Sequence, residues 1–269
     1  MRLTNEIKIL FIIYSLALFL WFYFTIFLSF TTSSFGYYFQ IPLAVVPLYG
    51  GISGLLKSRI WGGFKSSMGR ALGSLSLGLI MWGLGMVVWN YYIFISSIEV
   101  PYPSLADVFF ILSWPLWSYG VLQLSKVTGA HFGLREVSGK IYFIFIPIAV
   151  IFLSYYLLVM VARGGSIDLS VGNLQLFFDL FYPIGDVVIL TIVSLIYTLS
   201  RNFLGGVYRN HISLLFLGFV LNYFSDFMFS YTTYIGTYFN GHFVDLMFLT
   251  TMFILSVAVN NLGSIRKGL

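Results

Sequence analysis

The 269-residue chain is 59% hydrophobic and only 9% charged, against about 25% charged residues in an average soluble domain. This composition excludes an ordinary soluble domain and predicts a polytopic membrane protein whose first partner is the lipid bilayer. The absence of cysteine excludes disulfides, thiolate metal sites and cysteine nucleophiles. The net charge of +5 lies in short loops between apolar segments, so we expect no nucleic-acid partner.

Eight apolar stretches follow one another along the chain, each close to the roughly twenty residues that cross a bilayer as a helix. We therefore expect an all-α bundle of eight transmembrane helices. The first stretch is too long and too aromatic for a cleaved signal peptide, so we interpret it as a retained helix. The expected helices cover residues 7–30, 37–56, 71–96, 104–124, 141–162, 174–200, 212–234 and 243–262.

Basic side chains alternate between the two sides of this predicted topology. The two termini and the second, fourth and sixth loops carry 13 of the 14 lysines and arginines. By the positive-inside rule, we predict a multi-pass protein of the cell membrane with both termini in the cytoplasm. The exception is Arg163, which is close in sequence to Asp168 and falls on the outer side.

Two pairs of segments indicate an internal duplication. The loop SRIWGGFK, which begins at Ser58, resembles SRNFLGGVYR, which begins 142 residues later at Ser200. YPSLAD, which ends at Asp107, aligns with NGHFVD, which ends 138 residues later at Asp245. Because the offset is nearly constant, we interpret the chain as two parallel four-helix halves, the alternative being chance matches among abundant residue types. The predicted halves of the single membrane domain are residues 1–137 and 138–269.

The fourth predicted helix combines an acidic start with an internal proline. Ser104, followed three residues later by Asp107, predicts a capping box at the beginning of this helix. Pro115 leaves the carbonyl of Ile111 without its helical partner, which lipid tolerates only where a neighbouring group replaces it. We therefore place this helix inside a bundle, with Asp107 and its counterpart Asp245 as helix caps or ligands at the outer surface.

The sixth and seventh predicted helices carry acidic residues at membrane depth. Asp179 and Asp186 are seven residues apart and share one helix face, with Pro183 between them freeing the carbonyl of Asp179. Asn222 and Asp226 form a polar stripe on the next helix. A carboxylate at this depth costs several kcal/mol unless it is hydrated or paired, so these residues mark a functional site or bonds between helices.

By the predicted topology, these polar side chains fall in the outer half of the bundle. We predict that they converge on one outward-facing acidic cavity that binds a small ligand, a cation or protons, with no membrane lysine or arginine to neutralise it. The sequence does not specify a metal. The predicted site residues are Asp107, Asp179, Asp186, Asn222, Asp226 and Asp245, with Asn90 and Glu99 as further lining residues.

Several enzyme classes lack their essential residues, and we predict neither an enzyme nor a cofactor. The chain contains no HExxH motif and no glycine-rich phosphate loop after a strand. Asp186 and Asp226 meet the two-aspartate minimum of an intramembrane protease. However, the motifs of such proteases carry a tyrosine before the first aspartate and GxGD around the second, whereas here PIGD supplies only a glycine before Asp186. The last predicted helix has no lysine for retinal.

The segment YPSLADVFFILSWPLWSYGVLQL, which begins at Tyr102, resembles multi-helix membrane input modules of bacterial and archaeal signalling proteins. In those modules, a PSxAD step opens a helix ahead of a proline, and later helices carry further aspartates, as in DLFYPIGD here. The resemblance implies a sensor and covers about helices three to eight. Such modules often precede a cyclase or kinase domain, so a chain ending at Leu269 implies a separate membrane or cytoplasmic partner protein.

Three functions remain open from the sequence. The first is a sensor or receptor-like module, which requires a cavity open on one side only. The second is a proton- or cation-coupled transporter, in which Asp186 or Asp226 is protonated and broken helices meet at the midplane. The third is a structural subunit of a larger membrane complex, whose aspartates meet residues of a partner.

Overall fold

The computed structural model describes residues 4–27, 35–166, 170, 172–200 and 209–265, and every regular element in these ranges is helical. Eight of these helices are long and apolar enough to cross a membrane, as predicted. Their boundaries lie within a few residues of the expected ones. The long helices are α1 (Asn5–Phe27), α3 (Gln40–Ile60), α4 (Ser67–Tyr91), α5 (Leu105–Val127), α7 (Val137–Ser154), α8 (Asn173–Ser200), α9 (Arg209–Tyr234) and α10 (Phe243–Ser264).

Five short elements complete the described chain. The two π-helical segments extend α4 and α7, so these helices finish with wider turns. The other three lie in connections between long helices. The short elements are α2 (Phe35–Tyr38), η2 (Gly63–Lys65), η3 (Tyr92–Ser96), α6 (Ala130–Gly133) and η4 (Tyr155–Val161).

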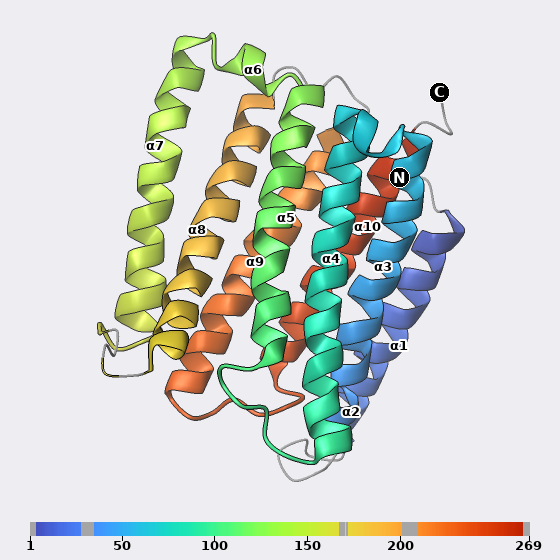
Figure 1. Cartoon of the computed structure of the whole chain (residues 1–269), viewed down its shortest axis with the longest axis vertical. Helices are drawn as coiled ribbons and strands as arrows, with labels where there is room; N and C mark the ends of the chain where they lie inside the picture. Colours follow the sequence, from blue (N-terminus) through green and yellow to red (C-terminus); the bar gives the residue numbers. More distant parts are fainter. Residues whose placement is uncertain (1–3, 28–34, 167–169, 171, 201–208, 266–269) are drawn as a thin grey trace.

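Six of the long helices form a closed ring in which each contacts the next, in the order α3, α4, α5, α8, α9 and α10, with α10 returning to α3. The helices run side by side along the long axis of the molecule (Figure 1). The remaining two lie outside the ring, α1 against α10 and α3, and α7 against α8. Side chains of α1 and α7 are consequently the least buried of the eight spans.

Glycines allow close approach at several contacts of this ring, among them the α3–α10 and α5–α8 contacts. A Cβ atom at Gly50 would collide with the side chain of Ser256, so the backbones of α3 and α10 approach closely there. At the contact between α5 and α8, the ring of Trp114 lies against Gly185, where a Cβ would approach it to 2.7 Å. Small residues therefore allow the close contact between α3 and α10, and a glycine under an aromatic ring allows the close contact between α5 and α8.

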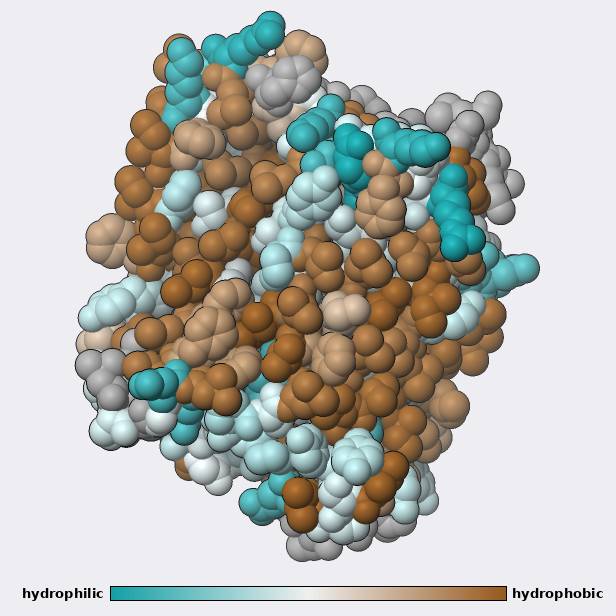
Figure 2. Space-filling model, viewed as in Figure 1, coloured by the Kyte–Doolittle hydropathy of each residue, from teal (hydrophilic) through white to brown (hydrophobic). Residues whose placement is uncertain are grey.

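The two ends of the bundle differ in charge. An apolar belt covers the middle of the face seen in Figure 2, with hydrophilic side chains toward both ends. One end, called here the basic end, contains the start of α1, the end of α10 and the connections that follow α3 and α5 (Figure 1). The basic end carries Arg59, Lys65, Arg70, Arg135 and Lys140.

Candidate functional site

A cavity of about 1250 Å³ lies between the ring helices at the end opposite the basic end. All six ring helices contribute to its wall, together with residues 97–102 and 238–240 of the connections before α5 and α10. Ile98 and Tyr102 in the first of these connections are exposed, so the cavity opens at this end. The wall includes all six predicted site residues, Asp107, Asp179, Asp186, Asn222, Asp226 and Asp245, and also Glu99.

Asn90 was predicted to line the same cavity but has another role. Its amide nitrogen donates to the carbonyl oxygens of Gln40, at 3.0 Å, and Met86, at 2.7 Å. Because Gln40 begins α3 and Asn90 lies near the end of α4, the side chain ties these two helices together. Its place among the predicted lining residues was therefore wrong.

Asp107 caps the N-terminus of α5 and links this helix to α8. The predicted capping box is present: the backbone N–H of Ser104 donates to Asp107 Oδ2 at 2.6 Å, and the Ser104 hydroxyl accepts from the first turn. The Tyr182 hydroxyl, on α8, donates to Asp107 Oδ1 at 2.6 Å. Both carboxylate oxygens of Asp107 thus have donors from the protein.

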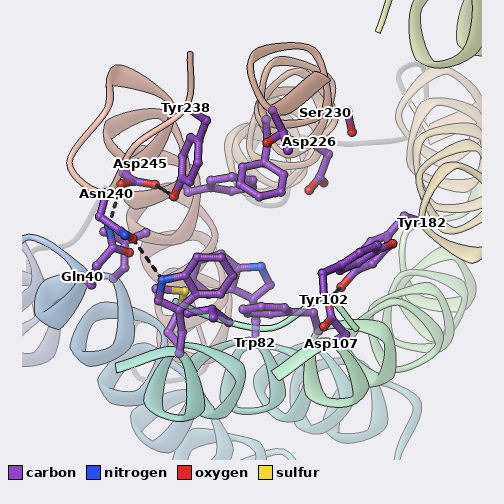
Figure 3. A pocket seen from close by; sticks show the side chains of 18 of the residues that line it. Gln40, Trp82, Tyr102, Asp107, Tyr182, Asp226, Ser230, Tyr238, Asn240 and Asp245 are labelled. Atoms are coloured by element: carbon purple, nitrogen blue, oxygen red, sulfur yellow. Dashed lines mark hydrogen bonds between the residues drawn. The ribbon is translucent and has the colours of Figure 1, made fainter. Parts of the chain in front are cut away.

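Asp245 occupies a similar position at the start of α10. Its Oδ2 accepts from the backbone N–H of Gly241 and from Gln40 Nε2 on α3, both at 2.6 Å, and its Oδ1 accepts from the Tyr238 hydroxyl at 2.9 Å. Burial, the larger cause, and the neighbouring Asp245 carboxylate, the smaller one, raise the pKa of Tyr238 well above its usual value. This hydroxyl therefore keeps its proton at neutral pH. Figure 3 shows the Asp107 and Asp245 clusters on opposite sides of the cavity.

Asp179 is bonded to Arg163, and this corrects one prediction. The Tyr102 hydroxyl donates to Asp179 Oδ1 at 2.8 Å, and Arg163 lies 3.9 Å from the same oxygen. Arg163 also donates to the Asp179 carbonyl oxygen at 2.9 Å, the carbonyl that Pro183 was expected to free. The prediction that no arginine neutralises the cavity was therefore wrong for this carboxylate. Asp168, the sequence neighbour of Arg163, lies outside the described residues.

The carboxyl groups of Asp186 and Asp226 lie next to each other between α8 and α9. Asn222, one turn from Asp226, donates to Asp226 Oδ2 at 2.6 Å. Asp186 and Asn222 are each only 2% exposed, yet Asp186 Oδ1 and Asn222 Oδ1 have no hydrogen-bond partner among the described residues. Trp114 Nε1, from α5, is a third buried polar atom on this wall that the described part of the chain leaves unpartnered.

Aromatic rings supply most of the remaining wall. The Trp82 ring lies 5.5 Å from that of Phe110 and 5.8 Å from that of Phe248, and Trp114 packs edge-on against Tyr182 at 5.1 Å. Trp117 lines the inner part of the cavity and contacts Phe219 beyond it, with ring centroids 5.6 Å apart. The cavity therefore combines flat apolar surfaces with carboxyl groups.

The charges on this wall do not balance. Six acidic side chains line the cavity, Glu99 and five aspartates, whereas Arg163 is the one basic residue among the lining residues. A concave surface with this imbalance attracts cations. Within the described ranges, no group of three or more His, Cys, Asp or Glu side chains is arranged to hold a metal ion. By its charge, the wall suits cations or protons.

Apart from Ser104 in the capping box, the sequence analysis did not identify the groups that bond to these acids. Tyr102 lies in the motif that contains Asp107, and Tyr182 lies between Asp179 and Asp186. A tyrosine hydroxyl this close in sequence to an aspartate can donate to a carboxylate, so these positions indicate possible donors. Gln40 is an amide side chain at the start of an apolar helix, and this also marks a polar contact. Arg163 lies between two helices and gave no local indication of its contact with Asp179.

The chain was compared with known proteins in three ways, and no protein-family model, no curated protein and no solved structure matches it.

Proposed function

We propose that the protein is a multi-pass membrane protein of the cell membrane that binds a small cationic ligand in the acidic cavity and acts as a sensor or receptor-like module. The observation that carries this proposal is the imbalance of six acidic side chains to one arginine on one wall. Burying several carboxyl groups together is unfavourable unless water, protons or a cation compensate. A cationic ligand supplies that compensation directly.

The proposed orientation places both termini in the cytoplasm and the cavity on the outer side. The apolar belt supports membrane insertion, because its eight helices have the length and hydropathy of spans. The basic end lies opposite the cavity, and the positive-inside rule assigns such an end to the cytoplasm. The ligand would therefore arrive from outside the cell.

We further propose that the chain consists of two parallel four-helix halves. Matching helix neighbours support this, with α1, α3, α4 and α5 of the first half corresponding to α7, α8, α9 and α10 of the second. Within the halves, α4 contacts α5 as α9 contacts α10, and α1 contacts α3 as α7 contacts α8. Between the halves, α5 contacts α8 as α10 contacts α3. Tyr182 binds Asp107 where Gln40 binds Asp245, each bond joining one half to the other. Gln40 and Tyr182 are 142 residues apart, the same offset that separates the two matching loops.

The binding proposal is tested on the full chain reconstituted in lipid nanodiscs. Thermal unfolding is followed while sodium, potassium, tetramethylammonium or phenethylammonium chloride is added at constant ionic strength. A cation that binds the folded protein raises its stability by about 2.7 kcal/mol at one hundred times its dissociation constant. Saturable stabilisation by at least one of these cations is expected. If none of them stabilises the protein, the proposal is wrong.

A coupled transporter is the second candidate, favoured by the Asp186–Asp226 pair. Two neighbouring carboxyl groups can exchange a proton for a cation, and that exchange is the elementary step of coupling. Uptake of the stabilising cation into proteoliposomes distinguishes the two functions. A transporter gives flux driven by a pH gradient and lost in Asp186→Asn, whereas a sensor gives binding without flux.

A further inference from the structure

The geometry points to Asp186, Asp226 and Asn222 as the subsite for the ammonium group of an organic amine, with the rest of the amine against the aromatic wall. This inference rests on the proposed cation binding and specifies both the chemical class of the ligand and the residues that select it. Asn222 donates to Asp226 on α9, and the Asp186 carboxyl group on α8 lies beside that of Asp226.

The other three aspartates of the cavity already have donors from the protein, and Glu99 lies exposed in the connection before α5. Asp107 accepts from Ser104 and Tyr182, and Asp179 accepts from Tyr102 and lies beside Arg163. Asp245 accepts from three separate donors. A ligand bound at these positions would have to displace existing bonds. The subsite must therefore be sought among acceptors that no protein group occupies.

Two such acceptors are Asp186 Oδ1 and Asn222 Oδ1, both on the cavity wall and on side chains that are 98% buried. Buried acceptors in native structures almost always have a donor, and an exception needs an explanation. An ammonium group carries a positive charge and three N–H donors, so it can satisfy both acceptors and also contact Asp226. A neutral ligand with a single donor could satisfy only one of them.

The surroundings favour an organic amine over a bare ion. The cavity of about 1250 Å³ is far larger than an ion requires and has the scale of a small-molecule pocket. Trp114 lies against Gly185, the residue before Asp186, which brings an aromatic face next to the subsite. Aromatic faces attract ammonium groups, and they also bury the apolar part of an amine. The unpartnered Trp114 Nε1 can donate to an acceptor on the same ligand.

The test measures binding of phenethylammonium to the full chain in nanodiscs by calorimetry, with phenethyl alcohol as the neutral analogue of the same shape. The amine is expected to bind saturably and the alcohol is not. Asp186→Asn is expected to weaken amine binding by about tenfold or more, because it removes a buried charge from the subsite. Asp179→Asn makes the same charge change elsewhere on the wall, and less than about a threefold effect is expected.

Two further variants make the experiment decisive. Asn222→Leu keeps the branched side-chain shape but removes the unpartnered oxygen together with the donor to Asp226, and it replaces Asp186→Asn as the test if that variant does not fold. Glu136→Gln, at the start of α7 on the basic end, makes a one-unit charge change far from the cavity and should leave amine binding unchanged. Circular dichroism and size-exclusion chromatography verify that each variant is folded.

Each outcome supports or overturns a defined statement. Equal weakening by Asp186→Asn and Asp179→Asn overturns the subsite while leaving cation binding by the cavity intact. Stabilisation by sodium or potassium without any binding of the amine overturns the ligand class but not the proposed function. If neither the amine nor an inorganic cation binds, both the subsite and the proposed function are wrong.

Discussion

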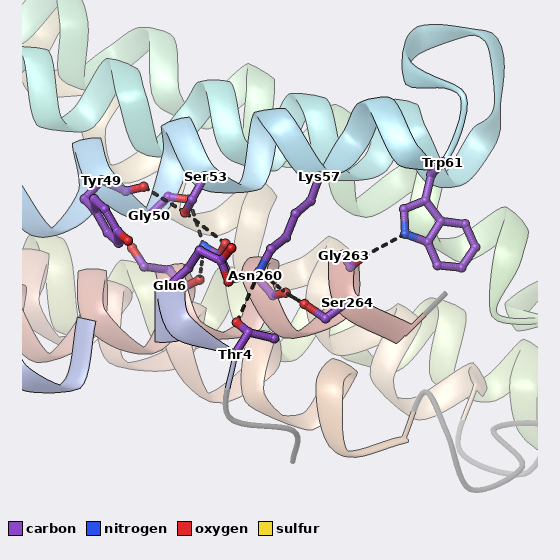
Figure 4. A network of polar contacts seen from close by, with 11 residues as sticks. Thr4, Glu6, Tyr49, Gly50, Ser53, Lys57, Trp61, Asn260, Gly263 and Ser264 are labelled. Carbon is purple, nitrogen blue, oxygen red and sulfur yellow. Dashed lines mark hydrogen bonds and ion pairs between the residues drawn. The ribbon is translucent and has the colours of Figure 1, made fainter. Parts of the chain in front are cut away.

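Two clusters of buried polar side chains, one around Asn260 and one around Asp186 and Asn222, differ in how fully they are hydrogen-bonded. At the basic end, Asn260 is fully buried and fully bonded: its Nδ2 donates to the carbonyl oxygens of Gly50 and Ser256, and its Oδ1 accepts from Ser53, each at 2.9 Å (Figure 4). At the cavity end, Asp186 and Asn222 are as deeply buried but keep unpartnered oxygens.

A charged group at the basic end is compensated in the same way. Lys57 is 7% exposed, and its ammonium group lies 3.2 Å from both the Glu6 carboxylate and the Asn260 carbonyl oxygen. We call Glu6, Ser53, Lys57 and Asn260 the basic-end network; it joins α1, α3 and α10. The bonds of the basic-end network hold three helices together, whereas Asp186 and Asn222 keep oxygens that no described residue occupies, as the proposed subsite requires.

The largest loss of stability is expected from a substitution that breaks the basic-end network. Asn260→Leu removes the bonds to Gly50, Ser53 and Ser256 and leaves the Ser53 hydroxyl facing an apolar side chain. We expect a loss of about 2 to 3 kcal/mol of stability, measured by thermal unfolding in detergent. Ser264→Ala, which removes a single hydroxyl bond to the Asn260 carbonyl, serves as the control and should cost about 1 kcal/mol or less. Equal stability of Asn260→Leu and the wild type would show that these bonds do not hold the helices.

The next prediction sharpens the comparison with one chemical change at two sites. Asp245→Asn turns an acceptor toward three donors into a group with its own N–H bonds, so we expect it to lose about 1 to 3 kcal/mol of stability. Asp186→Asn removes a buried charge that lacks a full set of partners, so stability should stay constant or rise. Thermal unfolding of both variants in the same detergent measures the difference. Similar losses in the two variants would mean that Asp186 is as fully compensated as Asp245.

A smaller effect is expected from the two tyrosines that bond across the cavity wall. Tyr182→Phe removes a donor to Asp107, and Tyr238→Phe removes a donor to Asp245, at a cost of about 1 kcal/mol each. The two losses should be similar, because each carboxylate keeps at least one other donor. Thermal unfolding measures both losses. Adding the cation that stabilises the wild type should leave the difference in stability between each variant and the wild type unchanged. A much larger loss in one variant would contradict the similarity of the two clusters.

The smallest effect concerns His242, which precedes α10 and packs against Phe239 and Phe243. Burial lowers its pKa below the usual 6.5, so the unfolded chain binds a proton more readily than the folded protein. Stability should therefore fall as the pH drops through 6.5 toward the lowered value. His242→Phe removes this contribution while keeping an aromatic ring. Comparing unfolding temperatures of the two proteins between neutral and mildly acidic pH isolates the effect, and identical pH dependence would contradict it.

Helix number and the acidic set were accessible from the sequence because both depend on strong local signals. Runs of apolar residues define spans, and an aspartate within such a run is conspicuous, as for Asp186 and Asp226. The bonding partners were less accessible. The chain contains 19 tyrosines, and nothing in the sequence around Tyr238 separates it from those that face outward. Likewise, the contact of Arg163 with Asp179 depends on how two connections fold back, which composition does not encode.

The contact between Trp117 and Phe219 has one more consequence. Beyond it, toward the basic end, Leu75, Val121 and Leu215 are buried side chains of the core, and no residue of the basic-end network lines the cavity. Among the described residues, the cavity therefore ends at this contact. For the proposed function, a closed inner end means that a ligand enters and leaves by the same opening, so its residence time would set how long the protein stays occupied.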